Sequence, residues 1–186
     1  MNKNTVIAVV ALFLLSGTLL VSGIATADDD EHNYRFWAKG TLPSVNNQLY
    51  KAECGSCHFA YQAGWLPARS WKKMMNELDD HFGENAELSD EPRVSITNYL
   101  MSEAADVKSN SKSRKVLRSI RENEAPQRIS TLSYMQHKHD DLSARHIENN
   151  PKVRSLSNCV ACHRGAEKGQ FDEHGVNVPG FGFWED

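Results

Sequence analysis

The pentapeptide Cys54-Gly55-Ser56-Cys57-His58 recurs later in the chain as Cys159-Val160-Ala161-Cys162-His163. Both copies have the pattern C-x-x-C-H, to which c-type haem is attached. The two thiols add across the vinyl groups of the porphyrin, and the histidine that follows becomes the proximal ligand of the iron. Because the chain has four cysteines and the two motifs use all of them, the sequence predicts two covalently attached haems.

Two other interpretations of the cysteines are weaker. A zinc site made from two C-x-x-C knuckles does not require a histidine after each knuckle, and an intervening stretch of roughly 100 residues exceeds the usual spacing of zinc modules. A pair of structural disulfides is common in exported proteins, but a tight C-x-x-C loop tends to be redox-active. Both alternatives leave the adjacent histidines as a coincidence.

Residues 1–27 have the pattern of a secretory signal peptide. Lys3 provides the positive charge near the N-terminus, and residues 6–21 form the mostly apolar region. Ala25-Thr26-Ala27 has the small-x-small pattern of a signal-peptidase cleavage site. The alternative is an uncleaved membrane anchor, for which the apolar stretch is near the lower length limit of roughly 17 residues. Haem attachment in bacteria takes place outside the cytoplasmic membrane, so we expect a periplasmic protein.

The full chain has a formal charge of −3, and loss of Lys3 with the signal peptide makes it −4. This charge argues against nucleic acid as a partner. The remaining length suits an N-terminal haem c domain at residues 28–107 and a C-terminal one at residues 108–186, joined through the polar run at residues 106–115. Each half is marginal as a bare polypeptide, so we expect the haem-free chain to fold poorly.

The predicted fold class is all-α, with two small cytochrome c-like haem domains and long loops, because apolar residues recur at helical spacing and strand patterns are absent. Ser70 and Ser89 are expected to cap two of the helices, and Gly83 to end the first of these. The expected helices cover about residues 46–53, 71–82, 90–101, 115–122, 131–139 and 142–147, with a short one running into Cys159.

The sixth ligand of each iron decides between electron transfer and ligand binding. For the first haem we choose His81, which continues the apolar face of the expected helix at residues 71–82, where an uncoordinated imidazole would be a costly buried polar group. The alternative is a histidine bonded to a backbone carbonyl or exposed at the helix end. Met101 is the rival ligand, since axial methionine follows the motif in many cytochromes c.

The second haem has two neighbouring candidates, His137 and His139. Side chains two residues apart on a helix point roughly opposite ways, so only one of them can easily reach the iron, and periodicity does not choose between them. His146 and His174 are weaker candidates, and His32 is a terminal residue.

The chain resembles the bacterial dihaem cytochrome c family, DHC, over nearly all of the expected mature protein. Beyond the two motifs, the resemblance rests on Lys138-His139 and on residues 50–61, 66–71, 78–86, 128–129 and 158–169. It implies two domains, each with one low-spin iron held by two histidines. The implied pairs are His58 with His81, and His163 with a histidine of the second half, for which the Lys138-His139 pair favours His139.

The resemblance also implies electron transfer instead of enzymatic catalysis. The implied partners are a membrane cytochrome b as donor and a small soluble oxygen-binding cytochrome c as acceptor, so that contact with a membrane occurs only through a partner or an uncleaved signal. The competing function is a dihaem enzyme or gas-binding protein, in which one iron has an exchangeable axial ligand.

Overall fold

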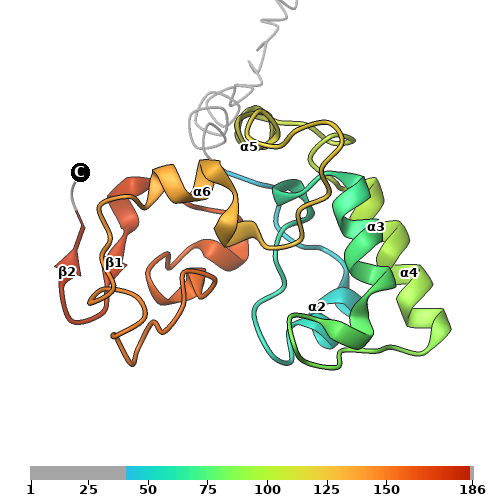
Figure 1. Cartoon of the computed structure of the whole chain (residues 1–186), viewed down its shortest axis with the longest axis horizontal. Helices are drawn as coiled ribbons and strands as arrows, with labels where there is room; N and C mark the ends of the chain where they lie inside the picture. Colours follow the sequence, from blue (N-terminus) through green and yellow to red (C-terminus); the bar gives the residue numbers. More distant parts are fainter. Residues whose placement is uncertain (1–40, 185–186) are drawn as a thin grey trace, which may run out of the picture.

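A computed structural model describes residues 41–184 as short helices joined by long loops (Figure 1). The predicted signal peptide at residues 1–27 and His32 lie outside the described residues. No helix within residues 41–184 is long and apolar enough to cross a bilayer. The mostly helical fold confirms the predicted class.

The first half contains α2 (Gln48–Cys54), α3 (Ala68–Asn76) and α4 (Asp90–Ser102), and the second half contains α5 (Ser111–Leu117) and α6 (Ser133–Lys138). Short 3-10 helices lie between and after them: Ala63–Trp65, Leu78–Asp80, Ile129–Thr131, Cys159–Ala161, Ala166–Lys168 and Glu173–Gly175. Near the C-terminus, β1 (Asn177–Val178) pairs antiparallel with β2 (Gly182–Phe183). This two-residue hairpin was not expected, because strands so short show no alternating pattern.

Four helix predictions were wrong in detail. The helix expected at residues 115–122 is α5, which begins at Ser111 and ends at Leu117. Helix α3 begins after Pro67, so Ser70 lies inside it, and it ends at Asn76 instead of near residue 82. Proline suits a helix start because its fixed φ is already close to the helical value. The helix expected at residues 142–147 is a series of turns, in which the Ser143 amide donates to His146 Nδ1 at 3.0 Å. The chain enters Cys159 from turns, without the short helix expected there.

His81 consequently lies in a turn after α3, and its predicted place on a helical face was wrong. Its backbone amide donates to the Glu84 carbonyl at 2.8 Å, and the Glu84 amide donates back at 3.3 Å. Phe82 and Gly83 both have positive φ, at 60° and 97°, which no helix can accommodate. A helix therefore cannot continue through Phe82.

One apolar core joins the two halves. Helices α3 and α4 pack together, and the fully buried Leu66 and Ile96 belong to the same cluster as Val116 of α5. The segment after α6 contributes few buried apolar residues, and these lie outside that cluster: Ile147, Val153, Ala166 and Val178. Because these buried residues are few, the last segment has only a small apolar core of its own, and much of it consists of turns and loops.

The first described residues pair with the second half. The Leu42 amide donates to the Gly169 carbonyl at 2.9 Å, and Thr41 forms an isolated bridge with Gln170. Gly169 has a φ of +75°, and a Cβ added there would lie 2.0 Å from the Leu42 carbonyl oxygen. Only glycine meets both requirements at this position.

Replacing Gly169 with alanine is expected to lower the free energy of unfolding by more than about 2 kcal/mol, because a left-handed conformation costs roughly 1–2 kcal/mol and the clash adds to it. The matched control is Gly180→Ala: Gly180 has a φ of +88°, but nothing lies within 4 Å of its added Cβ. Urea unfolding of the two holoproteins compares them. Equal losses would show that the contact with Leu42 is not what requires glycine.

Candidate haem-binding site

The first attachment motif begins on the last residue of α2, Cys54. The following histidine, His58, has its Nδ1 2.8 Å from the Phe59 carbonyl oxygen. A carbonyl can only accept, so Nδ1 carries the proton and Nε2 keeps a lone pair for a metal. The ring of His81 faces that of His58 with 6.1 Å between ring centres and 26° between planes.

The second motif lies on a 3-10 turn, in which the His163 amide donates to the Cys159 carbonyl at 2.8 Å. His139, directly after α6, has its Nδ1 2.8 Å from the Met135 carbonyl oxygen, which again leaves Nε2 for a metal. The rings of His139 and His163 have centres 6.1 Å apart and planes at 87°. The structure thus brings together both histidine pairs expected from the sequence.

The two equal separations fit a metal between each pair. An imidazole nitrogen binds a first-row metal at about 2 Å, so two imidazoles on opposite sides of one ion have ring centres about 6 Å apart. Both pairs meet this requirement although their ring planes differ.

The other candidate ligands lie elsewhere. The side chain of His137 is 82% exposed, with Nδ1 3.3 Å from a carboxylate oxygen of Asp140. His146 is buried, and its ring packs against Phe181 and Trp184 at 4.5 and 5.0 Å between centres. Met101 is half-buried at the end of α4. Among these other candidates within residues 41–184, His174 alone lines the cavity that holds the two pairs, and it is exposed.

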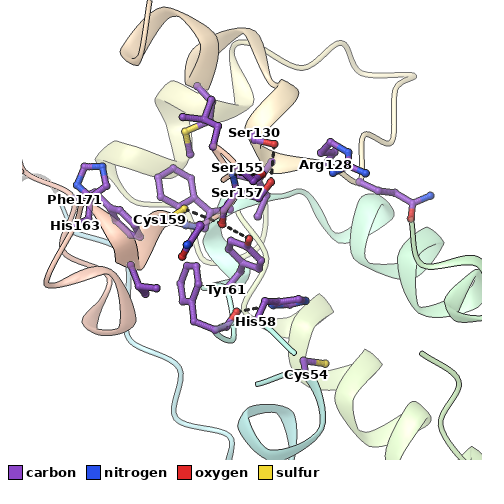
Figure 2. Close-up of a pocket in the computed structure, with 18 of the residues that line it drawn as sticks. Cys54, His58, Tyr61, Arg128, Ser130, Ser155, Ser157, Cys159, His163 and Phe171 are labelled. Atoms are coloured by element: carbon purple, nitrogen blue, oxygen red, sulfur yellow. Dashed lines mark hydrogen bonds between the residues drawn. The ribbon is translucent and has the colours of Figure 1, made fainter. Parts of the chain in front are cut away.

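A cavity of about 1420 Å³ contains both histidine pairs and all four cysteines. Figure 2 shows residues of both motifs around it. It exceeds the roughly 300–1,000 Å³ of a usual site for one ligand. Large apolar side chains contribute much of its wall: Trp71, Met74, Met75, Leu78, Met135, Ile147, Val153 and Phe171. The size and chemistry fit two porphyrins.

Burial lowers the pKa of two of these histidines, His81 and His163, and so favours the neutral form that binds a metal. It lowers the pKa of His163 to about 4, with smaller effects from His139 and Lys112. The pKa of His81 is also lowered, first by burial and then by His58 and Arg128.

Burial likewise raises the pKa of Cys54 and Cys159 to about 11 each, the opposite of the shift that activates a redox-active C-x-x-C thiol. Within residues 41–184 no cysteines are joined in a disulfide. In the same part of the chain, no three histidine, cysteine or acidic side chains converge on one point.

The sequence did not single out Lys112 and Phe171, which also line the cavity. The Phe171 ring packs edge-on against His163 with 5.6 Å between centres, and Lys112 Nζ lies 5.7 Å from the centre of the Phe171 ring. Nothing in the local sequence marks Lys112, because α5 reaches the site only through long-range packing.

The family model for dihaem cytochrome c (DHC) matches residues 50–171. The dihaem cytochrome c from Shewanella baltica OS155, known from an X-ray structure, is 41% identical in sequence to this chain. The matched region covers 76% of this chain and 99% of that protein, with a TM-score of 0.63. A dihaem cytochrome c from Rhodobacter sphaeroides is 44% identical to this chain. The matched region covers 70% of this chain and 100% of that protein, with a TM-score of 0.63. No curated protein matches the chain.

The match spans both attachment motifs and both histidine pairs. Cytochromes of the c type are electron carriers that typically work outside the cytoplasm. With its two C-x-x-C-H motifs, the chain therefore belongs to the dihaem cytochrome c family and carries two covalently attached haems c.

Proposed function

We propose that this protein is a periplasmic electron carrier in which each iron has two histidine ligands, His58 with His81 and His163 with His139. The observation that supports it is the 6.1 Å separation of ring centres in both pairs. A histidine on each side of an iron leaves no position for an exchangeable ligand, which is the arrangement of an electron-transfer site.

Each bound haem supplies a one-electron couple, and the chain tunes it. Two histidines favour a lower potential than a histidine with a methionine. The hydrogen bonds from His58 to Phe59 and from His139 to Met135 fix the ring orientations. The apolar wall of the cavity limits access of water to the site.

The expected location and partners extend this proposal. Residues 1–27 would direct export, and the two haem domains would comprise residues 28–107 and 108–186. By the family resemblance, a membrane cytochrome b donates electrons and a small soluble oxygen-binding cytochrome c accepts them. The charge of −4 of the cleaved chain would steer a basic partner, with an association rate that falls as salt increases.

The visible spectrum of the purified holoprotein tests the proposal against the alternative of an enzyme or gas-binding protein. We expect low-spin bands from both haems at rest and no change when carbon monoxide is added after reduction. A carbon monoxide complex in the native protein would show an exchangeable axial site and contradict the electron-carrier proposal.

Replacing His81 with methionine is expected to raise the potential of one haem while both haems remain attached. The increase should fall within the roughly 0.8 V range that axial ligands span. A redox titration measures both potentials. The control is Met101→Leu at the rival position, which should leave both unchanged. If neither potential moves in the His81 variant, His81 is not a ligand.

Lys112 places a positive charge near the second histidine pair. Burial is the main cause that lowers its pKa to about 8, and Lys115 and Lys138 add to the effect. A nearby positive charge favours the reduced iron, which has one more electron. Lys112 is charged below about pH 8 and neutral above it, so the potential of the second haem should fall as pH rises through that value.

Replacing Lys112 with methionine should therefore lower the potential of the second haem at pH 7, on the order of tens of millivolts, and weaken its pH dependence near pH 8. The matched control is Lys115→Met on the same helix, because the exposed Lys115 is better screened by water. Redox titrations at several pH values measure both effects. An equal shift in the two variants would contradict a specific role for Lys112.

A further inference from the structure

Two consecutive residues of the first half bind the second attachment loop on both sides of its motif. Tyr61 Oη donates to the Ser157 carbonyl at 2.6 Å, just before Cys159. Gln62 Nε2 donates to the Ala166 carbonyl at 2.7 Å, just after His163. Figure 2 shows Tyr61 between His58 and Ser157. The loop is thus held before and after the cysteines and histidine that it carries.

Tyr61 also contacts His58 of the first histidine pair. The centre of its ring lies 5.1 Å from that of His58 and 4.4 Å from that of Phe59. Its backbone carbonyl accepts a hydrogen bond of 2.9 Å from Tyr50 Oη on α2. Burial raises the pKa of the Tyr61 hydroxyl well above its usual value, so the hydroxyl stays protonated and donates. One side chain therefore joins the proximal histidine of one site to the attachment loop of the other.

Gln62 is buried, with 1% of its surface exposed, and both ends of its amide are bonded. Nε2 donates to the Ala166 carbonyl, and Oε1 accepts from Trp65 Nε1 at 3.3 Å. A buried polar group that is fully bonded favours one arrangement of its surroundings, because any other leaves a donor or acceptor unpaired. Gln62 therefore adds specificity to the contact.

Hydrogen bonds within the second attachment loop connect His163 to the residues on both sides of it. The Ala166 amide donates to the His163 carbonyl at 3.0 Å, and the His163 amide donates to the Cys159 carbonyl at 2.8 Å. The Ser157 hydroxyl lies 2.9 Å from that of Ser130. A constraint on Ser157 and Ala166 is consequently transmitted to His163.

We propose that Tyr61 and Gln62 are positioning residues that hold the second attachment loop against the first histidine pair and so fix the separation and orientation of the two haems. This inference rests on the proposed electron-transfer function. In internal exchange, one iron is oxidised and the other reduced by the same electron, with no bond made or broken. The rate of such a step depends steeply on the distance between the two haem sites and on the groups that lie between them. Tyr61 is one of these groups.

The test uses the holoprotein and the variants Tyr61→Phe, Gln62→Leu and the two combined. Tyr61→Phe keeps the ring and removes only the hydroxyl, so it disturbs the packing least of the three. The matched control is Tyr134→Phe, because Tyr134 is also a half-buried tyrosine that lines the cavity, but it lies on α6. Intact mass and resting spectrum establish first that each protein carries two low-spin haems.

Two measurements follow. In native-state hydrogen exchange, the amides of His163 and Ala166 should exchange roughly five to ten times faster in each single variant, as expected for the loss of one hydrogen bond, while the amides of α4 keep their wild-type rates. Internal electron exchange, followed after flash reduction of one haem, should slow several-fold in the double variant. Tyr134→Phe should change neither.

Wild-type exchange in the loop and a wild-type internal rate in the double variant would overturn the inference. Equal loss of protection in the loop and in α4 would also overturn it, because Tyr61 and Gln62 would then affect only global stability. The proposed function fails by a different observation, a five-coordinate haem or carbon monoxide binding in the wild-type protein. The two proposals are therefore tested separately.

Discussion

Replacing Cys159 and Cys162 with serine is expected to release the second haem and unfold most of residues 140–184. The buried apolar residues of this segment are few: Ile147, Val153, Ala166 and Val178. Segments of roughly 40 residues usually need a metal, a disulfide or another covalent constraint to fold. Without the porphyrin, the cavity of about 1420 Å³ would also lose the apolar group that its wall contacts.

Limited proteolysis with mass spectrometry measures this effect, and we expect the early cleavage sites to fall after α6. The matched variant replaces Cys54 and Cys57 with serine. The first half has its own packed helices, α3 and α4, so this variant should retain more helical circular dichroism. Resistance of the Cys159/Cys162 variant to protease, equal to that of the holoprotein, would show that residues 140–184 fold without their haem.

The sequence predicted the chemistry of the site better than its local structure. The two C-x-x-C-H motifs identify the cofactor because four cysteines and two histidines occur at a spacing that few other sites need. His81 was selected for its place on a helix, yet it reaches His58 from a turn. Periodicity could not reveal this, since the positive φ of Phe82 is a property of the folded turn.

Long-range contacts were the least predictable part of the fold. The apolar positions of α5 identify a buried face, but nothing in them shows that Val116 packs in the same core as Leu66 of the first half. The bonds of Leu42 to Gly169 and of Tyr61 to Ser157 join residues that are far apart in the sequence. Such pairings follow from the three-dimensional packing of all segments, which no spacing rule contains.

The choice between His137 and His139 leads to the prediction with the largest effect on the iron. Replacing His139 with alanine should leave the second haem attached but open one of its axial positions, so that the reduced protein binds one carbon monoxide. The variant should still fold, because it loses only the hydrogen bond between His139 Nδ1 and the Met135 carbonyl, worth about 1 kcal/mol.

His137→Ala is the matched control, two residues away on the same segment. The His137 side chain is 82% exposed and pairs with Asp140, so its loss should change neither the spectrum nor the response to carbon monoxide. Added imidazole should restore the low-spin spectrum of the His139 variant, because it can replace the missing ring in the cavity. If carbon monoxide instead binds only when His137 is removed, the ligand assignment is reversed, and α6 must turn its other face toward His163 in the holoprotein.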